Sequence, residues 1–431
     1  MSEREKIISE AHRYLILNIL DEVTPVVVSE AKGTVIRDID GREYIDLFSG
    51  IAVMNIGYSR DEIVEAVTQQ IKRYAHISYY YYVPVLVELA KKLASIMPSK
   101  KLTKSFFGNS GAEANECALK LARKYTKRYE FIALAPSFHG RTLATLSVTG
   151  QGGRKRGIGP LLPGVIFVPA PYCYRSRFAD DEEECGKVYV EIARDLVREA
   201  STSSVAALIV EPVLGEPGII PLPKNYLRIF KEEILDKYDA LLIVDEVQTG
   251  LGRTGRIFGI EHFNVEPDIV TTAKALGGGL PIGACTTTEE IASSFEPGDH
   301  FSTFGGNPVS AAAAIKTIDI ILREELHKKA WEKGIYVMKR LEELKQRHRV
   351  IGDVRGLGLM IGVELVRDEK KTPATHEAKR VKSLMREFGF LVGVGGIYGN
   401  VIRIQPPLVI SYEKLDKAIE ALDKALELVE R

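Results

Sequence analysis

The chain has 431 residues, with 58 basic and 58 acidic side chains and therefore no formal net charge. Its composition, 45% hydrophobic and 27% charged, is typical of a folded globular protein and excludes a disordered or fibrous chain. Because there is no basic surplus, we expect no nucleic-acid partner and no membrane anchoring. The length predicts two or three domains, or one large domain with an appendage.

The first segments of the chain predict a helix, a hairpin and a helix-rich region, in that order. Roughly the first 20 residues carry apolar side chains at a helical period. Residues 33–47 predict a β-hairpin whose turn is Asp40-Gly41. Residues 61–97 predict helices with a break near Pro84.

From about residue 104 the pattern changes to alternating strands and helices. Residues 111–127 place apolar side chains at i, i+3 and i+4, which predicts a helix. Further helices are expected at 187–200 and 224–237. Short apolar runs predict strands at 131–135, 164–170, 205–213, 240–247 and 268–274. This alternation predicts an α/β fold whose mainly parallel central sheet is flanked by helices on both faces.

From about residue 330 the chain predicts long charged helices, strands within 354–365 and 400–408, and a final helix from Tyr412. We expect a smaller α+β domain at 329–431 beside a large domain at 61–328. Residues 1–60 are expected to pack with the small domain, because chain ends often meet in space.

The four cysteines stand at positions 117, 173, 185 and 285 and include no CxxC pair. We therefore expect no disulfide framework, a packed thiol at Cys173 and a reducing, cytoplasmic location. The N-terminal MSEREK lacks the apolar segment of a signal peptide, which agrees with that location. The histidines show no metal spacing, so no metal is expected. Scarce Asn and Gln beside abundant Lys and Glu favour a thermophilic source.

Several polar residues follow the predicted strands at their carboxyl ends, where ligands bind to open parallel sheets. They are Glu211, Asp245, Gln248 and Lys274. A carboxylate buried at the end of an apolar strand needs a partner. Asp245 could pair with the protonated ring nitrogen of a pyridine cofactor or, alternatively, with Arg253 or Arg256.

Lys274 follows an apolar strand and precedes three glycines. A lysine that cannot reach water must be paired, neutral or covalently modified, and a Schiff base meets that demand. The alternative is a surface lysine that extends its amine to solvent. Its spacing of 29 residues from Asp245 favours the Schiff base.

Two loops could complete a cofactor site. The segment GNSGAEANE (108–116) leads into a helix whose N-terminus favours a phosphate, although Ser110 could simply cap that helix. After the strand at 131–135, Phe138 could cover a ring face with His139 beside it. The alternative places Phe138 in the core and leaves His139 as a hydrogen-bonded loop residue.

Six ordered segments together resemble the class III, fold type I pyridoxal-phosphate aminotransferases. They are GNSGAEA, SFHGRT, IVEPVLGEPG, LIVDEVQTGLGRTG, AKALGGGLPIGA and FSTFGGNP. The resemblance covers about residues 25–428. It implies a fold type I enzyme with a large cofactor-binding domain and pyridoxal 5'-phosphate as cofactor.

The resemblance also implies roles for individual residues. Lys274 would form the Schiff base and shuttle a proton, and Asp245 would keep the ring nitrogen protonated. Thr303 would reach the phosphate of a neighbouring subunit, which implies a homodimer or a dimer of dimers. The remaining cofactor-binding residues would be Ser110, Gly111, Ala112, Phe138, His139, Glu211, Val247 and Gln248.

Four further residues match the substrate-binding pattern of 4-aminobutyrate aminotransferases. Arg403 would bind an α-carboxylate, and Glu216 would neutralise Arg403 when an ω-amino donor binds. Arg141 would hold the distal carboxylate of 4-aminobutyrate, and Ile51 stands where ornithine-type enzymes carry tyrosine. The resemblance thus implies amino transfer from an ω-amino acid to a 2-oxo acid such as 2-oxoglutarate. Singly, each residue could be merely structural.

Two alternatives stay open within the same fold. Residues 153–178 and 351–365 resemble dialkylglycine decarboxylase, but Ile51, Phe138 and Glu216 replace its glutamine, tryptophan and serine. Amino-acid racemases and epimerases share the fold, and the sequence names no second proton donor for them. A Rossmann dehydrogenase is disfavoured because no GxGxxG opens a helix after the first strand. The preferred amino donor, the choice between dimer and tetramer, and the pathway are not fixed by these patterns.

Overall fold

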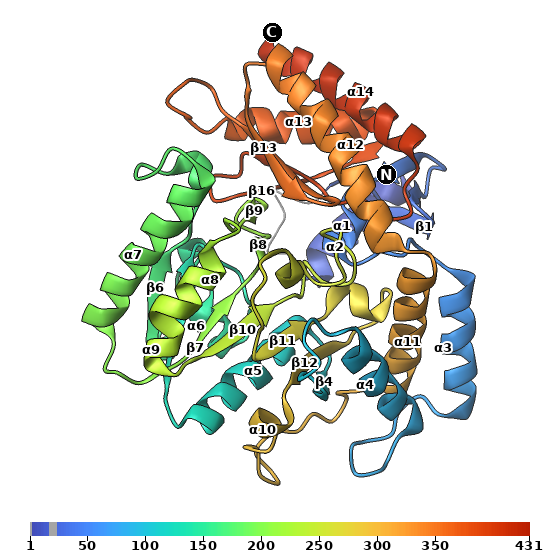
Figure 1. The fold of residues 1–431 in the computed structure, drawn as a ribbon. Helices are drawn as coiled ribbons and strands as arrows, with labels where there is room; N and C mark the ends of the chain where they lie inside the picture. Colours follow the sequence, from blue (N-terminus) through green and yellow to red (C-terminus); the bar gives the residue numbers. More distant parts are fainter. Residues whose placement is uncertain (1, 17–23) are drawn as a thin grey trace.

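A seven-stranded sheet forms the centre of the large part of the molecule (Figure 1). The computed structural model describes residues 2–16 and 24–431. Along the sheet the strands are β4 (Lys104–Gly108), β12 (Gly283–Thr287), β11 (Ile269–Thr272), β10 (Leu241–Asp245), β7 (Val205–Val210), β5 (Glu130–Ala135) and β6 (Val165–Pro169). All recorded pairings are parallel except the two made by β12. The predicted mainly parallel sheet is confirmed.

Both faces of this sheet are buried, which explains why the sequences of its central strands are continuous runs of apolar residues. Successive side chains in a strand point to opposite faces. In β10, Leu241 and Ile243 belong to the hydrophobic cluster that includes α5 (Gly111–Thr126). Leu242 and Val244 belong to the larger cluster on the other face.

The remaining helices of the large part lie partly at predicted positions, but those at 143–148, 289–292 and 308–323 were not predicted. They are α3 (Asp61–Arg73), α4 (Pro84–Ile96), α6 (Leu143–Val148), α7 (Glu182–Ala200), α8 (Tyr226–Phe230), α9 (Asp236–Tyr238), α10 (Glu289–Ala292) and α11 (Pro308–Arg323). Helix α4 begins at Pro84, because proline is tolerated in the first turn, where its missing N–H leaves no bond unmade. The single helix predicted at 224–237 is instead α8 and α9 joined by a π-helical turn at Lys231–Leu235.

A smaller α+β unit is built from the C-terminal part of the chain. Its four-stranded sheet contains β13 (Ile351–Leu357), β14 (Met360–Leu365), β17 (Val401–Ile404) and β16 (Gly393–Gly395). Its helices are α12 (Leu326–Arg347), α13 (Thr375–Glu387) and α14 (Tyr412–Glu430). The long charged helices and the final helix predicted from the sequence are therefore present.

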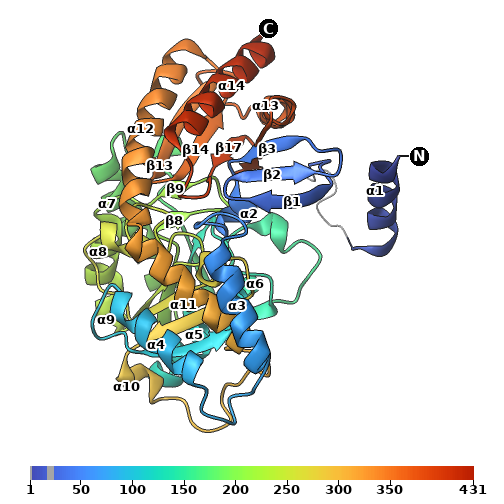
Figure 2. The same ribbon diagram turned by 90° about the vertical axis from the view of Figure 1, so that its right-hand side faces the viewer.

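The two ends of the chain meet in a third sheet (Figure 2). It contains β1 (Val28–Lys32), β2 (Val35–Asp38), β3 (Glu43–Asp46) and β15 (Phe390–Leu391), with β3 parallel to β15. The predicted hairpin corresponds to β2 and β3. The predicted N-terminal helix is α1 (Glu3–Tyr14), which has no buried residue, lies at the edge of the molecule in Figure 2 and contacts the third sheet through Arg4, 2.8 Å from Asp38. Its predicted end lies partly outside the described residues.

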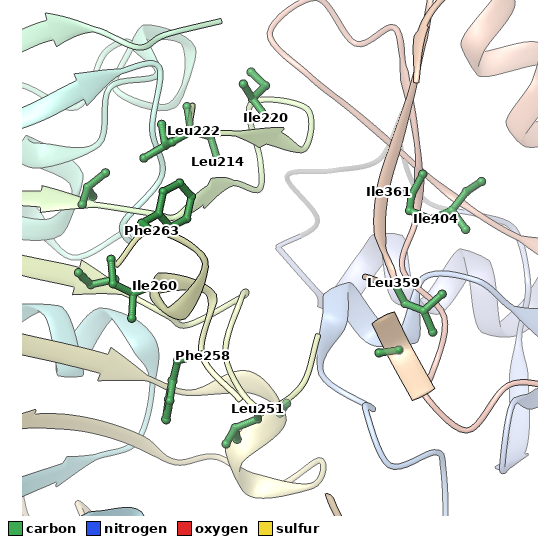
Figure 3. Packing of buried hydrophobic residues seen from close by; sticks show 14 of the residues in the cluster. Leu214, Ile220, Leu222, Leu251, Phe258, Ile260, Phe263, Leu359, Ile361 and Ile404 are labelled. Carbon is green, nitrogen blue, oxygen red and sulfur yellow. The ribbon is translucent and has the colours of Figure 1, made fainter. Parts of the chain in front are cut away.

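One hydrophobic cluster connects the large and small units. Figure 3 shows Leu251 and Phe258 from the segment after β10, and Leu359 and Ile404 from the small unit. All four belong to the same cluster of buried side chains. Shared apolar burial therefore fixes the small sheet relative to the segment that follows Asp245.

The structure corrects the prediction for two of the cysteines. Cys173 and Cys185 form a disulfide, so the expected packed thiol at Cys173 is wrong. The bond joins the loop after β6 to the first turns of α7, and only the fold brings these segments together. Cys117 and Cys285 are free and buried, as expected for a packed thiol.

Candidate active site

The polar residues predicted at strand ends lie along one edge of the central sheet. Asp245 is the last residue of β10, and its register partner in β11 is Thr271. Lys274 follows β11 at the start of a 3-10 turn, Lys274–Gly277. Parallel strands present their carboxyl ends at a common edge, which is where open sheets bind ligands.

Asp245 is buried and accepts three hydrogen bonds. Its Oδ2 accepts from His139 Nδ1 at 2.9 Å and from Asn115 Nδ2 at 2.8 Å, and its Oδ1 accepts from the Val247 backbone N–H at 3.0 Å. Among the described residues, Asp245 has no ion pair with an arginine. The alternative partner Arg253 is buried elsewhere and donates to the carbonyl oxygens of Leu359 and Pro406.

Asn115 is a site residue that the sequence reasoning missed. It lies on α5 and is 1% exposed. Besides donating to Asp245, it donates to the His139 carbonyl oxygen at 2.8 Å, while its own Oδ1 accepts from Thr271 Oγ1 at 2.6 Å. It therefore fixes the orientation of the Asp245 carboxylate. The available signal was its place inside the GNSGAEANE motif, on the helix face that it shares with the buried Ala118 and Ala122.

Lys274 lies within the cluster of carboxylates rather than extending into solvent. Its backbone has a φ of +43°, a strained conformation for a residue with a side chain. No hydrogen bond of its amine is found among the described residues. Burial lowers the pKa of Lys274, although the nearby carboxylates Glu216 and Asp245 act in the opposite direction. An amine with a lowered pKa, free of hydrogen bonds, is suited to nucleophilic and proton-transfer chemistry.

Glu211 connects two loops beside Asp245. Its carboxylate accepts hydrogen bonds from the backbone N–H groups of Phe138 and Gly215, both at 2.9 Å. Burial raises the pKa of Glu211 to about 7. The side chain therefore positions the Phe138 loop and the turn that carries Glu216.

The N-terminus of α5 forms a close-fitting cradle for an anion. Ser110 caps the helix, and its Oγ accepts from the Glu113 backbone N–H at 3.1 Å. A Cβ added at Gly111 would lie 2.8 Å from the side chain of Val247, so only glycine fits there. Unpaired N–H groups of Gly111 and Ala112 at this helix end would favour a phosphate.

A second cluster contains the predicted carboxylate-binding residues. Arg403 Nη1 lies 2.8 Å from Glu216 Oε1, and Arg403 Nη2 donates to Gln248 Oε1 at 3.1 Å. Burial raises the pKa of Glu216, but Arg403, Lys274 and Arg154 outweigh burial and leave that pKa below its ordinary value. Arg154, which lies 3.5 Å from Glu216, is a second residue that the sequence reasoning missed.

The other predicted site residues are more exposed. Ile51 is 42% exposed and lies in α2 (Ser49–Ala52), a turn whose residues all have positive φ angles. Arg141 is exposed, with its guanidinium 5.5 Å from the centre of the Phe138 ring. Thr303 is exposed in the loop before α11. Within the described residues, no hydrogen bond or ion pair joins Arg141 to Glu216 or Arg403.

A family model described as aminotransferase class-III matches residues 18–426. The chain belongs to the class III aminotransferase family. It is 44% identical over 411 residues to the leucine/methionine racemase of Thermococcus litoralis, covering 94% of this chain and 91% of the relative. It is also 44% identical over 398 residues to the acetylornithine aminotransferase of Methanothermobacter thermautotrophicus, covering 92% and 93% of the two chains.

The fold of this class III aminotransferase agrees with solved structures. A thermostable (S)-enantioselective omega-transaminase from Thermomicrobium roseum superposes with a TM-score of 0.93 at 33% identity, covering 100% of both chains. The predicted fold type I architecture is therefore confirmed.

Class III aminotransferases depend on pyridoxal 5'-phosphate, and the residues present fit that cofactor. The Lys274 amine, the buried Asp245 carboxylate and the helix N-terminus at Gly111 would hold the cofactor at its aldehyde carbon, its ring nitrogen and its phosphate. When bound, pyridoxal phosphate supplies an electron-accepting ring.

Within residues 2–16 and 24–431, no cluster of three or more His, Cys, Asp or Glu is arranged to hold a metal. No helix in those ranges is long and apolar enough to cross a membrane.

Proposed function

We propose that this class III aminotransferase moves the amino group of an ω-amino acid of the 4-aminobutyrate type to a 2-oxo acid such as 2-oxoglutarate. The observation that carries the proposal is the ion pair between Glu216 and Arg403. An ω-amino donor carries no α-carboxylate, so it needs Arg403 neutralised. The 2-oxo acid needs Arg403 free for a bidentate contact.

Each residue of the site has a separate role in the proposed amino transfer. Lys274 removes a proton from the donor carbon and returns one to the acceptor carbon. Asp245 would keep the ring nitrogen of a bound cofactor protonated, and His139 and Asn115 hold the Asp245 carboxylate in its orientation. Glu211 holds the two loops that enclose these groups. Arg141, above the Phe138 ring, would bind the distal carboxylate of the donor.

The proposed site is shared between two copies of the chain. Thr303 is exposed, so its hydroxyl is available to a neighbouring subunit. Exposed aromatic side chains at Tyr80, Tyr82, Phe301 and Phe304 give this region an apolar surface that suits subunit contact. Light scattering should give a mass of two or four chains, and a monomeric active enzyme would contradict the shared site.

An amino-donor panel with 2-oxoglutarate as acceptor tests the proposed function. We expect 4-aminobutyrate or another ω-amino donor, acetylornithine included, to be preferred over simple α-amino acids. Formation of glutamate is the measurement. If no ω-amino compound donates, the proposal fails.

Amino-acid racemisation is a second candidate, favoured by the similarity to the leucine/methionine racemase. A racemase needs no 2-oxo acid acceptor, so the need for an acceptor distinguishes racemisation from amino transfer. Loss of optical rotation in L-leucine or L-methionine without any acceptor would support racemisation. Turnover that requires 2-oxoglutarate would support amino transfer.

Replacing Glu216 with glutamine should shift the donor preference toward α-amino acids. The neutral side chain would leave Arg403 uncompensated and attractive to α-carboxylates. The kcat/KM ratio of alanine to 4-aminobutyrate should rise by roughly 5- to 150-fold. Glu420→Gln, on the exposed face of α14, is the matched control. An unchanged ratio would contradict a switching role for Glu216.

A further inference from the structure

Glu216 is held between two arginines, and the second of them has no role in the site described so far. Its Oε1 faces Arg403 Nη1 at 2.8 Å, while its Oε2 lies 3.5 Å from Arg154 Nη2. Arg154 ends a short 3-10 turn, Gly152–Arg154, in the loop after α6. Its Nε donates to Gln151 Oε1 at 3.2 Å, which orients the guanidinium. The two carboxylate oxygens are thus divided between two cations.

Of Glu216, Arg154 and Arg403, Arg403 has the side chain whose position is most firmly held. It is 2% exposed, lies on the central part of β17 and donates to Gln248. Its guanidinium also lies 5.3 Å from the centre of the Phe48 ring. An α-carboxylate that binds Arg403 must therefore displace Glu216 rather than draw Arg403 away.

The backbone around Glu216 is fixed as well. Arg355 donates to the carbonyl oxygens of Gly218 and Ile219 at 2.7 and 2.8 Å. On the other side, the Gly215 N–H donates to Glu211. The carbonyl oxygen of Glu216 itself accepts from the Gly396 N–H at 3.3 Å. Displacement of Glu216 therefore has to occur by rotation of its side chain alone.

The displaced carboxylate needs a cation, because an unpaired charge in a mostly buried position is strongly unfavourable. With Glu216 on Arg403, these three side chains carry a net charge of about +1, and an α-carboxylate brings the sum to zero. Arg154 is already in contact with the oxygen that faces away from Arg403. We infer that Arg154 receives the Glu216 carboxylate when an α-carboxylate occupies Arg403, which makes Arg154 a positioning residue for the 2-oxo acid half of the reaction. This inference rests on the proposed function.

The first test compares Arg154→Met with Arg154→Lys in the full enzyme. We expect Arg154→Met to raise the KM for 2-oxoglutarate, and its dissociation constant in calorimetry, by about 10-fold. kcat/KM for the ω-amino donor should change less than about threefold, because Arg403 still holds Glu216. Arg154→Lys keeps the charge and should restore most of the affinity. Lys155→Met is the matched control, since its amine lies over Phe167 and not over the site.

The second test places Arg154→Met in the Glu216→Gln background. A neutral side chain at 216 needs no receiving cation, so the effect of Arg154→Met on 2-oxoglutarate binding should vanish there. An effect that persists would show that Arg154 contacts the substrate directly, and an absent effect in the parent enzyme would show that it does nothing for binding. Either result overturns the inference. A parent enzyme without any ω-amino donor would instead refute the proposed function, while the calorimetric comparison would still decide the role of Arg154.

Discussion

An enzyme in which alanine replaces Lys274 should lose amino transfer almost completely, by roughly 10⁴-fold or more in kcat. The reason is that we assign two tasks to this one amine: it would hold the cofactor and would carry the proton between donor and acceptor carbons. Asp245 takes its three hydrogen bonds from His139, Asn115 and the Val247 backbone, and none of them comes from a lysine. Among the described residues, no second lysine amine is therefore hydrogen-bonded to Asp245 in a position to replace the lost one.

The fold should survive this substitution. The positive φ at position 274 is imposed by the surrounding chain, and alanine tolerates it about as well as lysine does. Circular dichroism and the melting temperature should match the parent enzyme, and Lys237→Ala on exposed helix α9 is the matched control. The parent should show an absorption band of the lysine-linked cofactor that borohydride abolishes, and Lys274→Ala should lack that band. Near-normal activity of Lys274→Ala would refute the assignment of the catalytic lysine.

The central sheet could be predicted because its strands are buried on both faces. The run VAALIV carries no polar residue, and LLIVD carries one only at its carboxyl end, Asp245. Strand β12 was not predicted, since its sequence GACTT is short and contains small residues that also occur in loops. The π-helical turn within 224–237 was missed because periodicity alone does not register one extra residue in a turn.

Among the site residues, those marked by their local sequence could be predicted, whereas those whose contacts depend on the fold could not. Lys274 and Asp245 could be found because each follows its own strand and their spacing matches a known family. Arg154 could not be found, because its contact with Glu216 joins residues 62 positions apart through the fold. The Cys173–Cys185 bond was missed for a different reason, because the absence of a CxxC pair and the expected reducing compartment suggested free thiols.

Asparagine in place of Asp245 should lower the rate of proton removal from the donor by roughly 10²- to 10⁴-fold and weaken retention of the cofactor. A carboxylate raises the pKa of a neighbouring ring nitrogen and so keeps the cofactor an electron acceptor, whereas a neutral amide does not. The amide also brings N–H donors to a position now surrounded by the donors His139, Asn115 and Val247. One of those donors must then lose its acceptor.

Two further variants separate the charge of Asp245 from its orientation. Asn115→Leu and His139→Gln both leave the carboxylate in place but remove a hydrogen bond that orients it. We expect each to reduce the rate by only about 10-fold, because the ring nitrogen keeps its anionic partner. The measurements are the cofactor dissociation constant and the single-turnover rate with a donor deuterated at the reacting carbon. Should Asp245→Asn retain the parent affinity and rate, Asp245 would be a structural carboxylate that only holds the His139 loop, and the charge would have no part in the chemistry.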